Sequence, residues 1–312
     1  MISNIFRKFI TFLSFYYFNN LDLIKKKDPI IISEINKKLN DSNIIKKNLK
    51  KTHNKFNEKL YNLILRGNFT HFLKYGFIQK MFFVHNRLFI YKELIQLKKG
   101  KWNLYKKLIK EDHVGDPIRY FLYPKSSGNK INHLYHLSIL SEEFNINLKS
   151  IKKVFEFGSG YGCMARIFSK INSSISYVCF DTPYVNLLQY YYLKQNGLNV
   201  GFKKKNNFIL MSSLNENKNY LNNLSNHLFI ANWSLSETPI KFRKNFFKLI
   251  KKSNLFLICF QEKFEDVNNL KYFNDLKKKL SRNFKVKMIK NNFYKGNFFN
   301  SQNHYFLIGK KW

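Results

Sequence analysis

The spacing of apolar residues changes near residue 150 and divides the chain into two regions. Upstream of this point, apolar side chains recur at the spacing of one helix face. Two such stripes are Phe56, Leu60, Leu63 and Ile64, and then Met81, Phe82, Val84, Leu88 and Ile90. Gly115-Asp116-Pro117 predicts a turn, and a further helix is expected from about Asn132 to Phe144. We therefore predict a helical N-terminal region over residues 1–150, which caps the acceptor side of the second region.

Downstream of residue 150, short apolar runs alternate with helical segments. The predicted strands are Lys153–Phe157, Ser176–Phe180, Phe208–Met211, Leu228–Ala231, Leu255–Phe260, Lys285–Ile289 and His304–Ile308. The predicted helices are Met164–Ile171, Val185–Asn196, Lys241–Lys252 and Leu270–Leu280. Strands that alternate with helices indicate a parallel sheet with right-handed crossovers. No helix separates the last two strands, so we expect an antiparallel edge on an α/β domain over residues 151–312.

A glycine-rich loop follows the first predicted strand and opens a helix. Glycines there let the backbone turn sharply and approach a ligand, and the helix N-terminus favours an anion. A dinucleotide fingerprint needs a third glycine or alanine where Cys163 stands. The spacing is instead G-x-G-x-G after an acid, which predicts contact with the methionine part of S-adenosylmethionine; an ordinary strand–helix turn is the alternative. The candidate cofactor residues are Glu156, Gly158, Ser159, Gly160, Tyr161 and Gly162.

Two further candidates follow later strands. Asp181 ends the second strand, where a carboxylate can accept hydrogen bonds from ribose hydroxyls. A helix cap before Pro183 is compatible with that role. Asn232 begins the loop after the fourth strand, and this loop should face the transferred methyl group because ligands lie beyond the carboxyl ends of strands. Ser236 to Pro239 also fits a simple helix start.

Methyl transfer to a nucleophile that carries a proton needs a proton acceptor. Glu237 is the first candidate because its loop follows the fourth strand. His136 is the second, with His133 one turn away on the same helix face, because a neutral imidazole suits the task at pH 7. A histidine pair of this kind is also a common structural feature. No residue pattern around it specifies a metal.

Several segments together resemble the sugar O-methyltransferase family. They are FEFGSGYG, FDTPYVNLLQYYYL and IANWSLSETP, in this order, with HVGDP and NHLYHL upstream, so the resemblance covers roughly residues 110–245. Phe157 and Ser159 replace residues that are often smaller or different in that family, without disturbing the loop. The resemblance implies the class I Rossmann-like fold with strand order 3-2-1-4-5-7-6, S-adenosylmethionine as cofactor, and a sugar hydroxyl as acceptor in surface glycan or nucleotide-sugar biosynthesis.

The formal net charge of +36 raises the alternative of an RNA or other nucleic-acid methyltransferase. Nearly all of this charge is lysine, which accompanies an excess of Asn, Ile, Phe and Tyr, and A/T-rich codons produce that combination. A phosphate or base reader is expected to use more arginine. Amino-group methylases of nucleic acids usually carry prolines after strand four, whereas Asn232 is followed by Trp-Ser-Leu. We therefore expect no specific nucleic-acid partner. A dinucleotide-binding or non-catalytic domain is disfavoured by the glycine spacing.

The remaining features concern the compartment. Cys163, Cys179 and Cys259 are too scattered for a disulfide framework or a zinc site and predict reduced thiols in a cytoplasm. The apolar segment Phe9–Phe18 is too short to span a bilayer. We expect it to pack on the domain, the alternative being a membrane-surface helix beside Lys25–Lys27. The expected location is cytoplasmic, with the inner face of the membrane as the alternative, and the oligomeric state is open.

Overall fold

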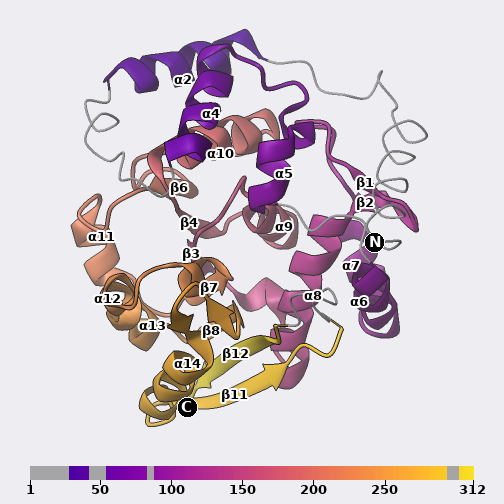
Figure 1. Cartoon of the computed structure of the whole chain (residues 1–312), viewed down its shortest axis with the longest axis vertical. Coiled ribbons are helices and arrows are strands. Elements are labelled where there is room, and N and C mark those ends of the chain that lie inside the picture. The colour runs from indigo at the N-terminus through magenta and orange to yellow at the C-terminus, as the bar shows by residue number, and fades with distance from the viewer. Residues whose placement is uncertain (1–27, 42–53, 83–87, 294–301) are drawn as a thin grey trace.

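A computed structural model describes residues 28–41, 54–82, 88–293 and 302–312. Its centre is an eight-stranded sheet in the order β11-β12-β8-β7-β3-β4-β6-β5 (Figure 1). The strands of this sheet are β3 (Lys153–Phe157), β4 (Ser176–Phe180), β5 (Val200–Gly201), β6 (Phe208–Met211), β7 (Leu228–Asn232), β8 (Leu255–Gln261), β11 (Phe284–Lys290) and β12 (His304–Lys311). Two small antiparallel hairpins accompany it: β1 (Arg119–Tyr120) with β2 (Tyr123–Ser127), and β9 (Lys263–Phe264) with β10 (Val267–Asn268).

The strand order confirms the predicted fold class. Counted from β3 and leaving out the short edge strand β5, the order is 3-2-1-4-5-7-6. The neighbours β5, β6, β4, β3, β7 and β8 pair in parallel. β12 is antiparallel to both β8 and β11, so the antiparallel strand lies inside the sheet and β11 forms its edge.

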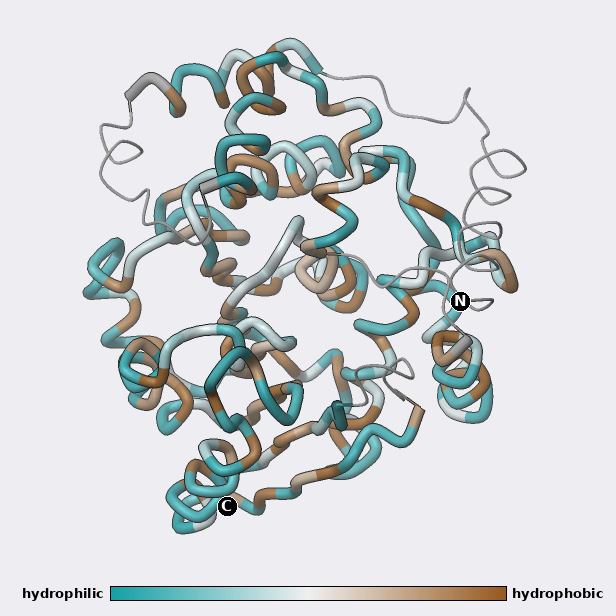
Figure 2. Tube along the Cα trace, in the orientation of Figure 1, coloured by the Kyte–Doolittle hydropathy of each residue, from teal (hydrophilic) through white to brown (hydrophobic). Residues whose placement is uncertain are grey.

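The inner strands form because they are apolar on both faces. All seven residues of β8 and the last four of β3 are buried, as expected for strands covered by helices on both sides. In Figure 2 these central strands are mostly brown, whereas the outer helices alternate between teal and brown. The molecule therefore has three layers, with the sheet between two groups of helices.

The helices lie where the sequence pattern predicts them, but several begin or end at other residues than predicted. The helix expected from Asn132 begins earlier, at Gly128, because the Ser127 side chain accepts from the Lys130 N–H and caps it. The segment expected as one helix over 241–252 is divided by a 3-10 turn. The second N-terminal stripe falls on two helices, and Val84 lies outside the described residues. The helices are α2 (Pro29–Asp41), α4 (Asn54–Leu65), α5 (Gly76–Phe82), α6 (Leu88–Lys99), α7 (Trp102–Leu108), α8 (Gly128–Glu143), α9 (Cys163–Ile171), α10 (Pro183–Gln195), α11 (Lys218–Asn223), α12 (Ile240–Arg243), α13 (Phe247–Lys252) and α14 (Asn269–Leu280).

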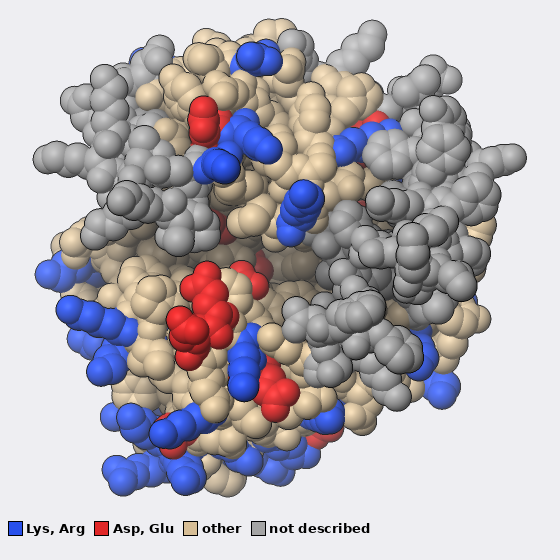
Figure 3. All heavy atoms as spheres, viewed as in Figure 1, with Lys and Arg blue, Asp and Glu red and all other residues tan. Residues whose placement is uncertain are grey.

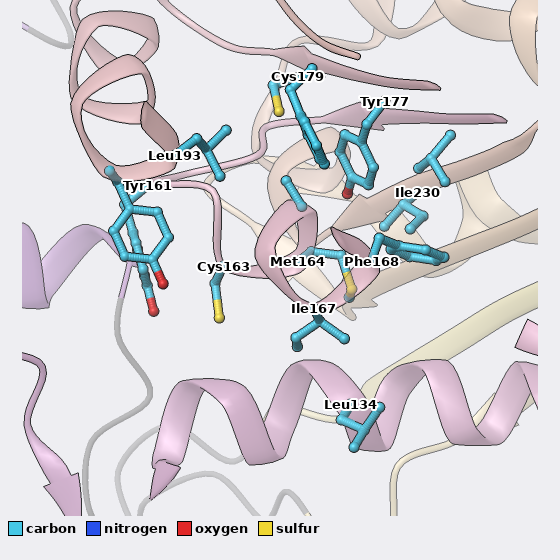
Figure 4. Close-up of a cluster of buried hydrophobic side chains, with 14 of the residues drawn as sticks. Leu134, Tyr161, Cys163, Met164, Ile167, Phe168, Tyr177, Cys179, Leu193 and Ile230 are labelled. Carbon is cyan, nitrogen blue, oxygen red and sulfur yellow. The ribbon is translucent and has the colours of Figure 1, made fainter. Parts of the chain in front are cut away.

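The N-terminal helices share one apolar core with the sheet. A single cluster of buried side chains runs from Ile31 on α2 to Ile308 on β12. In its centre α9 packs on the sheet, and Leu134 of α8 belongs to the same buried cluster as Ile167 of α9 (Figure 4). The apolar spacing changes near residue 150, but the two regions are packed together without a break. The other face of the sheet is covered by α11, α13 and α14.

The three cysteines and the N-terminal segment are the features from which the sequence predicted a cytoplasmic location. Cys163, Cys179 and Cys259 are free and buried, and β4 and β8 are separated by β3 and β7, so Cys179 cannot bridge to Cys259. The segment Phe9–Phe18 lies outside the described residues. Among the residues that are described, no helix combines the length and apolar character needed to cross a membrane.

Candidate functional site

The carboxyl ends of four parallel strands meet along one edge of the sheet. Phe157 at the end of β3 pairs with Phe180 on β4, and Phe180 pairs with Met211 on β6. β7 lies on the other side of β3, so Asn232 reaches the same edge. Ligands of open α/β sheets bind beyond this edge. The candidate site is therefore framed by the loops at 158–162, 181–182, 212–214 and 232–239.

The glycine loop is tied to Asp181 by backbone hydrogen bonds. The Gly160 N–H donates to Asp181 Oδ2 at 2.9 Å, and the Gly158 N–H donates to the Phe180 carbonyl at 2.8 Å. The second carboxylate oxygen of Asp181 accepts from the Thr182 N–H at 2.8 Å. Burial raises the pKa of Asp181 to about 7. Three predicted site residues, Gly158, Gly160 and Asp181, therefore lie together.

Glycine is required at two loop positions, for different reasons. The φ angles of Gly158 and Gly160 are 68° and 53°, in the left-handed region. A Cβ atom at Gly158 would lie 2.0 Å from the Ser234 Cβ, so this glycine makes room for the loop after β7. A Cβ atom at Gly160 would lie 3.2 Å from the Phe82 ring. The end of α5 therefore lies against the glycine loop. Gly162, at φ 95°, is the N-cap residue of α9.

Gln189 on α10 supports the loop, although the sequence pattern did not single it out as a site residue. Its Nε2 donates to Ser159 Oγ at 2.8 Å and to the Gly160 carbonyl at 2.6 Å. Its Oε1 is buried and has no hydrogen-bond partner within the described part of the chain. The Gln-Tyr-Tyr run within the family resemblance contained the signal. The loop at 212–214 was also missed, because the short strand before it gives a weak pattern.

Two predicted cofactor residues direct their side chains into the core beneath the loop. Glu156 is 2% exposed, and its Oε2 accepts from the Tyr177 hydroxyl at 2.7 Å. Burial raises the pKa of Glu156 to about 8. The Tyr161 ring packs edge-on against Tyr192, with the ring centroids 5.0 Å apart. Both side chains are therefore packed in the core, each 2% exposed.

His136 on α8 contacts the end of β7. Its Nδ1 lies 3.2 Å from Asn232 Oδ1 and 3.5 Å from Cys259 Sγ, and its ring packs edge-on against Trp233 and Phe306. Burial lowers the pKa of His136 to about 3, so the imidazole is neutral and a weak proton acceptor. His136 Nε2 and Asn232 Nδ2 are buried without a hydrogen-bond partner among the described residues.

His133 lies one turn earlier on the same face of α8. Its Nδ1 is 2.8 Å from the Asn129 carbonyl, and because a carbonyl only accepts, the proton is on Nδ1 and the lone pair on Nε2. The residue is partly exposed, and burial of the ring lowers its pKa. Asn129 contacts the Tyr161 hydroxyl and His136 contacts Asn232. This face of α8 therefore extends from the glycine loop to the end of β7.

The first residue after β7 has a strained backbone. Trp233 has a φ of 60°, which bulky residues rarely adopt. Its N–H donates to the Cys259 carbonyl and its Nε1–H donates to His304 Nδ1, both at 2.8 Å. Strain of about 1–3 kcal/mol persists only where surrounding contacts enforce it, and such residues cluster at functional sites.

A buried arginine holds the rest of this loop. Arg243 on α12 is 1% exposed, and its guanidinium donates to the Ser236 carbonyl at 2.7 Å and to the Thr238 carbonyl at 2.8 Å. A third bond of 2.8 Å goes to Asn269 Oδ1 on α14. Between these carbonyls, Glu237 is exposed. Desolvation raises the pKa of the Glu237 carboxyl group, and a hydrogen bond with Gln261 opposes this rise.

The charge on this face is unevenly distributed. In Figure 3, acidic side chains gather below the central hollow and over β9 and β10, whereas lysines and arginines are spread around them. Glu265 and Asp266, between β9 and β10, are exposed. Within the described ranges, no group of three or more His, Cys, Asp or Glu side chains could hold a metal ion.

Comparisons with known proteins reveal similar solved structures but no family. No protein-family model matches the chain, and no curated protein matches it at a significant level. The similar structures include the Methanococcus jannaschii fibrillarin pre-rRNA processing protein, with 13% identity, a TM-score of 0.36, and coverage of 53% of this chain and 69% of that chain. A precorrin-6y C5,15-methyltransferase from Geobacter metallireducens has 10% identity, a TM-score of 0.40, and coverage of 59% and 89%. An rRNA methylase from Streptococcus thermophilus has 13% identity, a TM-score of 0.40, and coverage of 59% and 96%.

These three structures, with TM-scores of 0.36 to 0.40, do not identify a family for this chain. At such TM-scores the fold assignment rests on the strand order of this chain itself. Two of the three proteins are methyltransferases by name, and the narrower resemblance to the sugar O-methyltransferase family gains no support from them.

Proposed function

We propose that this protein is an S-adenosylmethionine-dependent O-methyltransferase. The observation that supports it most is the hydrogen-bonded unit of Gly160 and Asp181 at the carboxyl edge of a sheet ordered 3-2-1-4-5-7-6. A carboxylate at this place accepts hydrogen bonds from ribose hydroxyls, and a glycine loop admits a ligand close to its backbone. When bound, the cofactor supplies a methyl group activated by its sulfonium.

The polar atoms left unpaired at this edge suit such a ligand. S-adenosylmethionine has a ribose diol, an ammonium and a carboxylate. Asp181 would hold the ribose. Gln189 Oε1 is an acceptor and Asn232 Nδ2 a donor, both buried without a hydrogen-bond partner among the described residues, and they would meet the ammonium and the carboxylate. Buried polar atoms are usually paired, so these two atoms, on α10 and at the end of β7, are the candidates for contacts with a polar ligand.

We assign the proton-accepting role to His133, with Glu237 as the competing candidate. His133 has a fixed neutral tautomer, and it lies on the α8 face between the glycine loop and the end of β7. Glu237 is hydrogen-bonded to Gln261. His136 is less suited because burial lowers its pKa to about 3. Asn129 positions His133 through its carbonyl.

The acceptor that we propose is a sugar hydroxyl, in surface glycan or nucleotide-sugar biosynthesis. The acidic side chains over β9 and β10 would repel a phosphate backbone near the site. The first observation to make is the methylated product isolated from cells with and without this protein.

Replacing Gly160 with valine should weaken cofactor binding at least tenfold. A branched side chain at φ 53° is strained, and its Cβ would crowd the Phe82 ring; a cost of about 1.4 kcal/mol already gives a tenfold change. Calorimetric titration with S-adenosylmethionine measures the effect. Gly197→Val is a matched control, because Gly197 has a φ of 78° with nothing within 4 Å of an added Cβ. Wild-type affinity in Gly160→Val would contradict the site.

Cofactor affinity should rise with pH through about 7. The ionised carboxylate of Asp181 accepts ribose hydrogen bonds, and the raised pKa means that Asp181 binds a proton below about pH 7. Affinity at pH 6 should therefore be about tenfold lower than at pH 8. The amino group of the cofactor also titrates near this range. The pH dependence of affinity is therefore measured for Asp181→Asn as well, and this variant should lose the part of the pH dependence that Asp181 causes. An identical pH dependence in both proteins would remove Asp181 from the site.

The basic charge should not form a specific nucleic-acid site. Lysine-rich, dispersed charge gives weak association that salt screens. Fluorescence anisotropy with labelled RNA at physiological salt should reveal only weak, sequence-indifferent binding. Submicromolar, sequence-selective affinity under those conditions would replace the sugar acceptor with RNA.

A further inference from the structure

A dense basic surface lies at the edge of the sheet opposite the candidate site. The register of the strands places it there, because Lys285 of β11 pairs with Lys310 of β12, and Lys310 pairs with Leu255 at the start of β8. The amino ends of β8, β7 and β3 meet along this edge. α14 ends at Leu280, shortly before β11 begins, and contacts β11. The seven residues of β8 separate this edge from the carboxyl edge by about 20 Å.

The surface, called the basic end below, contains seven cationic side chains and one indole. They are Lys277, Lys278, Lys279, Arg282, Lys285, Lys310, Lys311 and Trp312. The twelve residues 277–285 and 310–312 hold these seven cations and no acid, whereas the whole chain has 55 Lys and Arg in 312 residues. The charge is therefore far denser here than the general excess of lysine explains. In Figure 3, blue side chains gather at this lower end, around the C-terminus marked in Figure 1.

The cations of the basic end are available to a partner. All are exposed except Lys277, which is partly exposed, and none forms an ion pair with any described residue. Asp275 on α14 is exposed nearby, and its single negative charge does not offset seven positive ones. Unpaired like charges repel one another and oppose folding.

Structural roles account for only part of this charge. Lysines in the last turn of α14 stabilise the negative end of the helix dipole, and a lysine on the edge strand β11 discourages pairing with another chain. Neither role applies to Lys310 and Lys311, because β12 lies inside the sheet, between β11 and β8. Charge that folding does not need indicates an anionic partner.

Trp312 favours a lipid surface among the possible anionic partners. This residue is 79% exposed, and its backbone N–H donates to the Asn283 carbonyl at 3.2 Å, which fixes it beside the start of β11. Tryptophan is enriched at membrane–water interfaces, where the ring contacts apolar chains and the Nε1–H remains hydrated. Lysines beside it suit anionic headgroups. Nucleic-acid recognition uses arginine forks instead, and Arg282 is the one arginine of the basic end.

The opposite edge of the sheet carries the opposite charge. Glu237 follows β7, and Glu265 and Asp266 follow β8; all three are exposed. The field of an anionic surface decays over about 8 Å at physiological ionic strength. Such a surface therefore attracts the basic end at close range and repels the acidic edge when that edge approaches. The molecule has one favoured orientation on it.

We propose that the basic end binds an anionic lipid bilayer and turns the candidate site away from it. The lysines meet the headgroup phosphates, and the Trp312 ring enters the headgroup layer. The carboxyl edge then faces the water, so the methyl acceptor reaches the site from the aqueous side. This binding requires neither the proposed methyl transfer nor the apolar segment Phe9–Phe18.

Sedimentation of the full chain with vesicles tests the surface. The vesicles are phosphatidylcholine alone, or an equimolar mixture of phosphatidylcholine and phosphatidylserine. The wild type should bind the mixed vesicles and not the neutral ones, and high salt should release it. Lys278→Gln with Lys285→Gln and Lys310→Gln should bind about 100-fold more weakly, because each lysine near an anionic surface strengthens binding about fivefold.

The control removes the same charge from a distant surface. Lys55→Gln with Lys59→Gln and Lys80→Gln changes three exposed lysines on α4 and α5, and this variant should bind the mixed vesicles as the wild type does. Equal losses in the two triple variants would assign the binding to net charge alone and overturn the proposal. Undiminished binding by the first variant would place the contact elsewhere, for instance in residues 1–20, and overturn it as well.

Trp312 provides a second readout, because the chain has three tryptophans. With mixed vesicles, the emission of the wild type should shift to shorter wavelength, and Trp312→Phe should lose this shift, since Trp102 and Trp233 lie outside the basic end. A shift that persists in Trp312→Phe would overturn the proposed contact. Binding of homopolymer RNA that the first triple variant loses, without any binding to vesicles, would make the basic end a nucleic-acid surface and overturn the proposal too.

Discussion

His133→Ala should lower turnover by about 10²–10⁴-fold, the usual contribution of a positioned base, and leave cofactor affinity nearly unchanged. The imidazole holds its proton on Nδ1 through the Asn129 carbonyl, so Nε2 is the atom that would accept the hydroxyl proton. Alignment of the acceptor with the methyl group is untouched and retains part of the acceleration. The measurement is transfer of label from methyl-labelled S-adenosylmethionine to the carbohydrate fraction that contains the acceptor.

Two further readouts separate proton transfer from a structural role of His133. With saturating cofactor, the wild-type rate should fall only in acid, below the lowered pKa of His133, because protonation removes the accepting lone pair. Added imidazole should restore part of the activity of His133→Ala. Glu237→Gln is the decisive comparison, and it should retain most activity. A loss of 10²-fold or more in Glu237→Gln with wild-type rates in His133→Ala would move the role to the carboxylate. Loss of cofactor binding in Glu237→Gln would make that residue a binding or structural group.

Arg243→Met should destabilise the protein by about 3–5 kcal/mol. Three acceptors would lose their donor: the carbonyls of Ser236 and Thr238, and Asn269 Oδ1. A buried polar group without a partner costs about 1–3 kcal/mol. The guanidinium also stacks on Tyr272, 4.8 Å from the ring centroid, and this contact would be lost too. Because the first two acceptors belong to the loop after β7, the variant should also bind the cofactor more weakly.

Denaturant unfolding measures this loss, provided that the slope of the transition is unchanged. Arg282→Met is the matched control, since Arg282 is exposed, and surface substitutions usually stay within about 0.5 kcal/mol. Arg243→Lys should fall between the two, because an ammonium group cannot reach three acceptors in the geometry of a guanidinium. A stability equal to that of Arg282→Met would show that the buried arginine does not hold the loop.

The sequence by itself determined the sheet and the position of its edge. β3, β4 and β6 have the predicted bounds. An inner parallel strand is apolar on both faces, so it is a run of consecutive apolar residues that can be recognised in the sequence. The glycine loop and Asp181 could be predicted for a related reason. A turn with positive φ demands glycine locally, and the alternation of strands and helices places the following acid at the same edge.

The tertiary structure decided which side chains at this edge are available. Glu156 and Tyr161 are within the motif, but both are buried in the core, where Glu156 accepts a hydrogen bond from Tyr177 and Tyr161 packs against Tyr192. Gln189 lies in a segment of the family resemblance, but only the fold shows that it supports the loop from α10. His133 and His136 have the same helical spacing, and only the burial of one and the carbonyl contact of the other tell them apart. Burial and long-range hydrogen bonds depend on the neighbours that folding brings together, and the spacing of residues along the chain does not record those neighbours.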